Sequence, residues 1–486
     1  MDKEEIPDLL NYIAGEFNSS LNGKWMDDIS PATGVRIARI PCSNKQDIDA
    51  AVSAARAALP EWSALTHEQR ADWLDKIANA MEERSEEIAQ LESLDTGKPI
   101  TLARTVDAAR SVANFRFFAE CVREFVPETF EMNDATNHVL YKPVGVAGLI
   151  TPWNLPLYLL SWKVAPALVM GNTVVAKPSE LTPMTASLLA EIIDEVGLPS
   201  GVFNLVHGAG EEAGAPLTSH DDVDLISFTG GTETGSRVAS AASSSFKKLS
   251  LELGGKNATI VFADSDLDKT LPGVLRASFL NQGQICLCGS RILIEESIYD
   301  VFVEGLINAT NSMKIGDPSD PETDLGALVS PEHLAKVTGY ISLAQDEGGK
   351  IIAGGSKPEG IPNQFSEGNW LSPTIIDGLS PDSRCSTEEI FGPVVTLHAF
   401  ADEKEALEIA NSTNYGLAGS VWTSDLEKGR RIAEGIDTGM VWINTWLHRD
   451  LRVPFGGIKH SGVGREGGRW SLSFYSHAVN ICLKHD

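Results

Sequence analysis

The chain of 486 residues carries 39 lysines and arginines against 67 aspartates and glutamates, which gives a formal net charge of −28 at pH 7. This excess of negative charge repels nucleic acid and anionic lipid surfaces, so nucleic-acid binding and membrane association are disfavoured. With 42% hydrophobic residues the chain can bury a large core, and its length predicts two or three domains.

The cysteines and the first residues bear on cellular location. Six cysteines are spread thinly, with no Cys-x-x-Cys pair and no cluster with histidine at the spacing of zinc ligands. This pattern predicts a reduced, cytoplasmic protein without a metal site. Residues 1–7 are acidic and do not lead into an apolar run, so neither a signal peptide nor a transit peptide is expected.

Helical periodicity dominates the first hundred residues. Apolar side chains recur every three or four positions at Ile48, Val52, Ala55 and Leu59, as on one face of a helix. The Thr-x-x-Gln pattern of residues 66–69 is typical of a capping box and predicts the start of a second helix.

Short apolar runs alternate with helical segments from residue 144 onward. Strands are expected over 144–150, 173–176, 202–206 and 225–228, with a helix over 185–196. A second series of strands is expected over 258–262, 291–295 and 440–444. Residues 144–176 are long and apolar enough to span a bilayer, but their prolines and polar residues indicate buried core instead. This alternation predicts an α/β protein with parallel sheets.

The last apolar run, residues 478–484, predicts a strand near the end of the chain. An unpaired strand edge promotes aggregation unless it is covered. We therefore expect this strand to pair with another subunit.

Two glycine-rich segments compete as a phosphate-binding turn. Residues 208–213 match the G-x-G-x-x-A fingerprint after an expected strand, and residues 228–235 place Gly230 and Gly231 between a strand and a helix. Either segment could instead be a tight βα turn. Lys177 and Glu180 follow another expected strand, at the edge where ligands of open α/β sheets bind, although such charged residues are often only solvated.

Cys286 follows the polar run Asn281-Gln282-Gly283-Gln284, and Glu252 precedes it in the chain. A thiolate is a strong nucleophile, and a nearby carboxylate could act as the base for covalent catalysis. The alternative is a cysteine that only fills core space. The residues alone leave both possibilities open.

Seven motifs spread along the whole chain resemble those of the NAD(P)-dependent aldehyde dehydrogenase superfamily and occur in that family's order. They are Pro152-Trp153-Asn154, Lys177-Pro178-Ser179-Glu180, Phe228-Thr229-Gly230, Leu251-Glu252-Leu253-Gly254-Gly255-Lys256, Asn281-Gln282-Gly283-Gln284-Ile285-Cys286, Glu389-Ile390-Phe391-Gly392-Pro393 and Pro454-Phe455-Gly456-Gly457. The resemblance implies three parts. A Rossmann-like NAD-binding domain comprises residues 1–125 and 145–254, an α/β catalytic domain 255–465, and a small β oligomerisation domain 126–144 and 466–486.

The resemblance also assigns roles to residues. Cys286 would attack the aldehyde, Asn154 and the Cys286 backbone amide would hold the oxyanion, and Glu252 would activate water to hydrolyse the thioester. NAD would be bound by Trp153, Lys177, Glu180, Gly230, Gly231, Leu253, Glu389 and Phe391. The carboxylate of Glu180 favours NAD over NADP. Gly231 departs from the family, which often has serine there, and residues 208–210 become a structural turn.

Four further segments resemble the 2-aminomuconate and 2-hydroxymuconate 6-semialdehyde dehydrogenases. These segments are residues 114–118, 152–157, 286–288 and 446–452. The resemblance implies a substrate with a carboxylate remote from the aldehyde, which an arginine fork can bind. Arg116 and Arg452 are the expected clamp, with Arg449 in reserve.

Other functions stay open at this point. They are a broader aldehyde dehydrogenase for betaine aldehyde, aminoaldehydes or retinal-like substrates, an enzyme that transfers the acyl group to coenzyme A, and a catalytically silent structural homologue. The resemblance also implies self-association into a dimer or tetramer.

Overall fold

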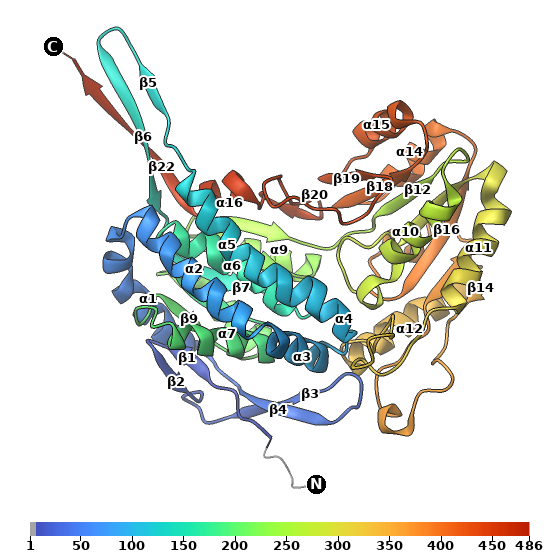
Figure 1. Ribbon diagram of the computed structural model, residues 1–486, viewed down its shortest axis with the longest axis horizontal. Helices are drawn as coiled ribbons and strands as arrows, with labels where there is room; N and C mark the ends of the chain where they lie inside the picture. Colours follow the sequence, from blue (N-terminus) through green and yellow to red (C-terminus); the bar gives the residue numbers. More distant parts are fainter. Residues whose placement is uncertain (1–5, 486) are drawn as a thin grey trace.

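The computed structural model describes residues 6–485 of the chain. Figure 1 shows two α/β lobes side by side and an arm of antiparallel strands that projects from one of them. The α/β class that the alternation predicts is therefore confirmed.

The first lobe contains an eight-stranded sheet with its five central strands parallel. In spatial order its strands are β2 (Glu16–Asn18), β1 (Asn11–Ile13), β9 (Phe203–Leu205), β8 (Thr173–Lys177), β7 (Val146–Ile150), β10 (Leu225–Thr229), β11 (Lys248–Glu252) and β21 (Gly462–Val463). The four strands expected from the sequence in this region are all present. Residues 144–176 form β7, a buried helix and β8, as expected for core.

Helices cover both faces of this sheet because its strands are buried on both sides. Val146 and Ile150 of β7 pack with α1 (Lys45–Ala64), α8 (Ala215–Ser219) and α9 (Thr232–Ser243). Ala147 and Leu149, which alternate with them, pack toward α6 (Pro156–Val169) and α7 (Met184–Glu195). An outer layer on that second side comprises α2 (His67–Glu83), α3 (Ser85–Thr96), α4 (Ile100–Leu102), the π-helix η1 (Ala103–Ala108) and α5 (Ala109–Arg123).

The predicted helix start at Thr66 is confirmed. The Thr66 hydroxyl accepts from the Gln69 backbone amide, and the Gln69 side chain accepts from the Thr66 amide. Asn44 and Asp47 form a second capping box at the start of α1. Both boxes satisfy amides that a helix end leaves without a partner.

The second lobe contains a seven-stranded sheet, parallel except for one edge strand. Its order is β14 (Lys350–Ala353), β15 (Thr374–Asp377), β16 (Val394–Phe400), β13 (Arg291–Glu295), β12 (Ala258–Val261), β18 (Ala418–Trp422) and β19 (Met440–Ile443). Helices α10 (Leu267–Phe279) and α11 (Tyr299–Asn311) pack on one face, and α14 (Glu403–Asn411) and α15 (Leu426–Gly435) pack on the other.

Along the chain, the step from the first sheet to the second lies between β11 and β12. One pairing crosses it, because β21 joins β11 with Leu251 opposite Val463. The other elements are β3 (Trp25–Ile29), β4 (Arg36–Pro41), η2 (Gly210–Gly214), η3 (Leu280–Gly283), η4 (Glu296–Ile298), α12 (Pro331–Asp346), η5 (Asn363–Phe365), α13 (Arg384–Thr387), β17 (Tyr415–Gly416), β20 (Ile458–Lys459) and α16 (Gly468–Phe474).

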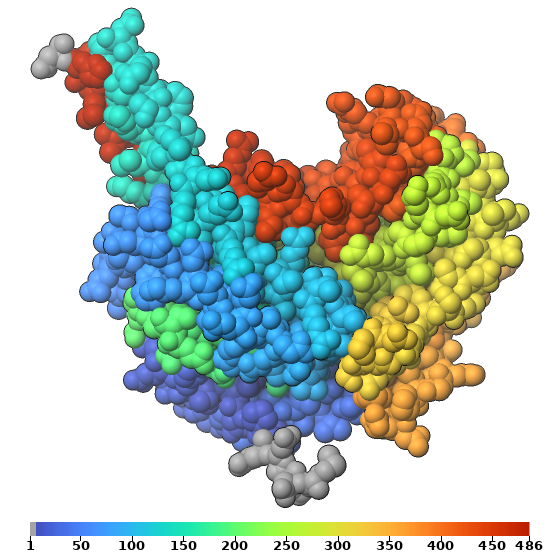
Figure 2. Space-filling model, viewed as in Figure 1, coloured from blue at the N-terminus to red at the C-terminus, as the bar shows by residue number. Residues whose placement is uncertain are grey.

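The projecting arm is a three-stranded antiparallel sheet. Its order is β22 (Ser476–Lys484), β6 (Ala135–Pro143) and β5 (Thr129–Glu131). The predicted C-terminal strand is thus present, and it pairs along its whole length with β6 of the same chain. Since β22 lies at the edge of the sheet, its outer edge faces away from β6, and the arm stands clear of the body in Figure 2.

Within residues 6–485, none of the helices is both long and apolar enough to cross a membrane.

A pair of buried carboxyl groups lies beneath the outer helices. Asp28 of β3 and Asp95 of α3 are 1% and 0% exposed. Burial raises the pKa of Asp28 to about 7 and holds the pKa of Asp95 well above its usual range, where the neighbouring Asp28 adds to the effect. Two carboxyl groups side by side out of water share a proton because both cannot ionise cheaply.

We expect the fold to lose stability as the pH rises through this pair. The pKa of this carboxyl group is near 4 in the unfolded chain and about 7 in the folded protein. Its contribution to the free energy of unfolding is therefore fully present below about pH 4 and is lost as the pH rises to about 7. Asp28→Asn keeps a donor toward Asp95 and removes one acid. The melting temperature of Asp28→Asn, measured relative to that of the wild type, should therefore rise as the pH increases from 5 to 8. Asp27→Asn, which changes the exposed neighbouring residue, should show no such pH-dependent difference. Parallel pH profiles for all three proteins would contradict the shared proton.

Candidate active site

A cavity of about 560 Å³ lies where both lobes contribute residues, beside the carboxyl end of the first sheet. Asn154, Glu252 and Cys286, the three expected catalytic residues, all line it. The eight residues expected to bind NAD line it as well: Trp153, Lys177, Glu180, Gly230, Gly231, Leu253, Glu389 and Phe391. The fold thus brings together eleven side chains and backbone segments that are up to about 240 positions apart in the chain.

Cys286 is partly exposed to this cavity and follows the tight turn η3. Its carbonyl accepts a hydrogen bond of 2.7 Å from Asn257 Nδ2. Burial, and then the Glu389 and Glu252 carboxyl groups, raises the pKa of the Cys286 thiol well above its usual range. The resting side chain is therefore the thiol, and it becomes nucleophilic when a proton leaves.

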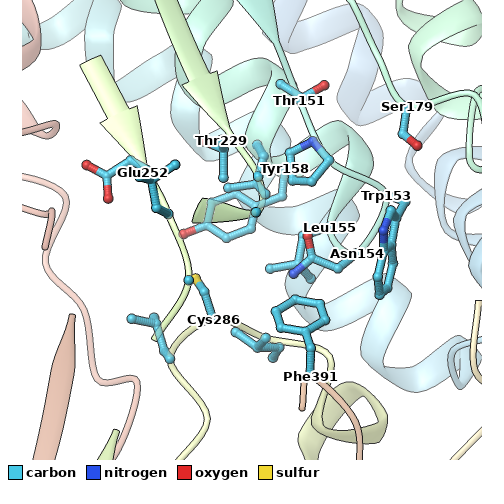
Figure 3. Close-up of a pocket in the computed structure, with 18 of the residues that line it drawn as sticks. Thr151, Trp153, Asn154, Leu155, Tyr158, Ser179, Thr229, Glu252, Cys286 and Phe391 are labelled. Carbon is cyan, nitrogen blue, oxygen red and sulfur yellow. The ribbon is translucent and has the colours of Figure 1, made fainter. Parts of the chain in front are cut away.

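Asn154 follows β7 and is 5% exposed. Its Nδ2 donates to the carbonyl of Gln284 at 2.8 Å, so the carboxamide lies against the segment that carries Cys286. In Figure 3, Cys286 lies between Asn154 and Phe391 on one side and Glu252 on the other. This placement suits an amide donor to an oxygen on a carbon that Cys286 attacks.

Glu252 is the last residue of β11 and is 4% exposed. Neither of its carboxylate oxygens has a hydrogen-bond partner in the described part of the chain. Burial and the nearby Glu466 hold the pKa of Glu252 well above its usual range, while the cations of Lys163 and Arg449 oppose this rise. A carboxyl group with a raised pKa can act as a general base near neutral pH.

Lys163 and Glu466 form a buried ion pair next to this base. Lys163 Nζ lies 2.7 Å from Glu466 Oε1 and donates to Ser227 Oγ at 2.8 Å. Neither residue belongs to a motif that predicts a function. Lys163 was visible only as a charged residue within an apolar run, the signal of a group that must find a partner when buried.

Lys177 and Glu180 form an ion pair at the edge of the cavity. Lys177 Nζ lies 3.0 Å from Glu180 Oε2, and the pKa of Glu180 is lowered by Lys177 and by the Gly210 amide against the effect of burial. Gly210 also lines the cavity. The expectation that residues 208–210 are only a structural turn is therefore incomplete.

Glu389 and Phe391 form the opposite wall. Glu389 accepts a 2.8 Å hydrogen bond from the Gly255 amide, and a side chain at Gly254 would collide with its carboxyl group. Phe391 adopts a left-handed backbone, with φ of 63°, and its ring stands edge-on to Trp153 at 5.3 Å. His333, which no sequence motif indicated, donates from Nε2 to the Phe391 carbonyl at 2.7 Å.

The structure does not bring the two expected substrate arginines to the cavity. Arg116 faces outward from α5 in an ion pair with Glu82, and its side chain is 43% exposed. Arg452 pairs with Asp450 and is 80% exposed. Each therefore already has a carboxylate partner in solvent, and the expectation that they form the clamp is wrong.

Arg449 lies in the cavity instead, with Arg110 and Arg276. Its guanidinium carbon is 4.4 Å from the centre of the Trp162 ring and 4.1 Å from that of Phe455. Nη1 donates to the Tyr158 hydroxyl at 2.7 Å, whereas Nε and Nη2 are buried without a partner among the described residues. Two donor nitrogens of this guanidinium thus lack a partner among the described residues.

Comparisons with known proteins agree with this geometry. The model of the aldehyde dehydrogenase family matches residues 17–481. The mouse 2-aminomuconic semialdehyde dehydrogenase is 46% identical over 99% of both chains. The 2-hydroxymuconic semialdehyde dehydrogenase of a Pseudomonas strain is 46% identical over 99% of this chain and 100% of its own.

Solved structures give the same result. PnpE from a Pseudomonas species, in complex with nicotinamide adenine dinucleotide, superposes with a TM-score of 0.96 at 42% identity and covers 98% of both chains. Betaine aldehyde dehydrogenase from Staphylococcus aureus, with NAD+, gives a TM-score of 0.95 at 38% identity over 98% of this chain and 94% of that one. The chain belongs to the aldehyde dehydrogenase family.

Proposed function

We propose that this protein oxidises a carboxylate-bearing, muconic-type semialdehyde to the corresponding acid, with NAD as the cofactor. The family and the names of the relatives support the reaction and the substrate class. The observation that carries the substrate class is Arg449, because this cation lines the cavity that holds Cys286 and two of its nitrogens have no partner among the described residues.

A carboxylate is the ligand that fits Arg449 best. The rings of Trp162 and Phe455 remove the guanidinium from water, and the Tyr158 hydroxyl fixes its plane. A planar fork held in this way binds a carboxylate through two parallel hydrogen bonds. Arg110, which also lines the cavity, adds positive charge. A cationic substrate such as betaine aldehyde would be repelled.

The residues fit NAD. Gly231 is the N-cap of α9, where the helix end favours a phosphate, and a side chain at Gly231 would meet no atom within 4 Å. Gly230 lines the cavity beside it, with its amide donating to the Glu252 carbonyl at 3.0 Å. Glu180 and Lys177 are placed for ribose hydroxyls, and Glu180 would repel a 2′-phosphate. Trp153, Leu253, Glu389 and Phe391 line the rest of the cavity. When bound there, NAD supplies the acceptor for the hydride.

The chain's own residues would perform the remaining steps. Cys286 Sγ gives its proton to water in the cavity and attacks the aldehyde carbon, and the oxyanion accepts hydrogen bonds from Asn154 Nδ2 and the Cys286 amide. Loss of the hydride leaves a thioester on Cys286. Glu252 then takes a proton from water, which attacks the thioester carbon, and the acid departs as Cys286 is restored.

Transfer of the acyl group to coenzyme A is the less favoured outcome. Glu252 is buried, unpartnered and close to Cys286 in the same cavity, as a water-activating base requires. A silent structural homologue is also disfavoured, because such a protein has no need to keep a buried, unpaired Glu252 and Arg449, each of which costs stability.

We further propose a cytoplasmic protein that self-associates. The six cysteines are all free, as suits a reducing compartment. The outer edge of β22 and the exposed Phe130, Met132 and Leu483 of the arm form a surface that a second copy would cover. Dimer and tetramer both satisfy this argument.

Replacing Arg449 tests the substrate class. Arg449→Gln should lower kcat/KM for a muconic-type semialdehyde by about 10- to 100-fold, since hydrogen bonds to a charged group contribute about 1.5–3 kcal/mol. Its kcat/KM for a neutral aldehyde should change far less. Assays of NADH absorbance with both aldehydes make the comparison.

Arg116→Gln and Arg452→Gln are the matched controls. Both remove an arginine that is exposed and already paired, so both should keep the wild-type preference. Equal losses on acidic and neutral aldehydes in Arg449→Gln, or a selective loss in either control, would reject the Arg449 clamp.

Replacing Glu252 tests the base. Glu252→Gln should release about one NADH per active site in a burst and then turn over about 100- to 10,000-fold more slowly, because the thioester forms but is not hydrolysed. Stopped-flow absorbance separates the two phases. Steady turnover at the wild-type rate would exclude Glu252 as the base.

The charge of Glu466 should be visible in the pH profile. Since Glu466 raises the pKa of Glu252, Glu466→Gln should lower it and shift the rise of the hydrolysis rate to lower pH. The rate of the slow phase is measured from pH 6 to 10. A shift to higher pH would contradict this interaction.

Gly231, where the family often has serine, allows a substitution that should increase the affinity for NAD. Gly231→Ser should place a hydroxyl beside the phosphates in open space and lower the Kd for NAD by about 2- to 10-fold, the worth of one net hydrogen bond of about 0.5–1.5 kcal/mol. Titration calorimetry measures the Kd. Gly339→Ser, also in open space but on α12, is the control, and an unchanged or weaker affinity in Gly231→Ser would refute the prediction.

A further inference from the structure

The Asn281 side chain bridges the backbone carbonyls of two segments, one that carries Asn154 and one that leads to Cys286, which also touch directly where Asn154 Nδ2 donates to the Gln284 carbonyl at 2.8 Å. Its Nδ2 donates to the carbonyl of Asn154 at 3.1 Å and to the carbonyl of Gln284 at 3.3 Å. Asn281 is 1% exposed and does not line the cavity, so it acts from behind the residues that do.

The backbone around Asn281 is strained. Asn281 and Gln282 have φ of 54° and 56°, and Gly283 follows with φ of 68°. Consecutive left-handed residues other than glycine cost free energy and persist only where the surroundings hold them. Gln282 Nε2 donates to the Ala327 carbonyl at 3.1 Å, and a side chain at Gly283 would collide with the Gly392 carbonyl.

The Asn154 carbonyl is held from a second direction. Lys98 Nζ, which is fully buried, donates to it at 3.1 Å and to Asp107 Oδ1 at 2.9 Å. This carbonyl therefore accepts from both Lys98 and Asn281. Asn154 therefore cannot move away from Lys98 or from Asn281 without breaking a buried hydrogen bond.

The two bridged carbonyls lie next to the two groups that would bind the oxyanion. One is the carbonyl of Asn154 itself, and the other is that of Gln284, two residues before the Cys286 amide. We propose that Asn281 is a positioning residue that fixes the spacing between the Asn154 carboxamide and the Cys286 amide. This inference rests on the proposed function, in which both groups stabilise the thiohemiacetal oxyanion. A displacement of about 1 Å in such a site can cost about 100-fold in rate.

Asn281→Asp keeps the shape and tolerates the left-handed backbone, but places a carboxylate against two carbonyl oxygens. The burst rate of NADH should fall about 10- to 100-fold at neutral pH. Because a protonated acid can donate one hydrogen bond, the ratio of variant to wild-type burst rate should rise as the pH falls. Asn281→Gly relaxes the backbone and has no side-chain donor. Its burst rate should fall by the same factor, and the ratio of its burst rate to that of the wild type should not depend on pH.

Asn204→Asp is the matched control. Asn204 is also fully buried, and its Nδ2 also donates to two carbonyls, those of Val174 and Gly201, at 3.1 and 2.9 Å. It lies in β9, away from Cys286, so its variant should lose stability and keep the burst rate of the folded enzyme. The rate of Cys286 alkylation by iodoacetamide and the Kd for NAD should stay at wild-type values in both Asn281 variants.

Three outcomes separate the possibilities. Burst rates in the Asn281 variants that match the wild type per folded molecule would show that Asn281 serves the fold alone. A loss of burst rate in step with a loss of Cys286 alkylation or of NAD binding would show general disruption and would also overturn the proposal. Failure of the wild type itself to form NADH with any aldehyde would refute the proposed function instead.

Discussion

Desolvation sets the charge of the groups around Cys286. Burial raises the pKa of the Cys286 thiol and of the Glu252 and Glu389 carboxyl groups, and the two carboxyl groups raise the pKa of the thiol further. The cations of Lys163 and Arg449 oppose this at Glu252. The nucleophile and the base are therefore poised to lose protons during the reaction, and they do not carry charge permanently in a dry site.

The free-energy cost of removing a charge from water also explains why most buried cations have partners. Lys163 pairs with Glu466, Lys98 with Asp107, and the guanidinium of Arg291 donates to three backbone carbonyls. Arg449 has only the Tyr158 hydroxyl and two aromatic faces. Lys256 Nζ is likewise buried without a partner among the described residues, and both Lys256 and Arg449 therefore carry charge that the fold does not satisfy fully.

The sequence predicted the elements better than it predicted side-chain directions. Strands β7 to β10 and the capping box at Thr66 follow from local period and spacing, which neighbouring residues determine. Arg110 and Arg116 lie six positions apart on α5, so they point about 120° apart and only one can face the cavity. Arg449 and Arg452 lie in an irregular loop with Leu447 in the left-handed region, where no period indicates which arginine points inward. The pairing of β22 with β6 could not be predicted either, because the two strands are far apart in the chain and meet only in the folded arm.

Arg449 also links the substrate to the base. As a free cation it lowers the pKa of Glu252. A carboxylate bound to it would offset that field, so Glu252 would hold its proton more firmly while an acidic substrate occupies the cavity. A neutral aldehyde would leave the field in place. Under the proposed function, the positive charge of Arg449 therefore has two effects: it selects an acidic substrate, and it shifts the pKa of the base that hydrolyses the thioester. Both effects are strong because the surrounding protein screens the guanidinium only weakly.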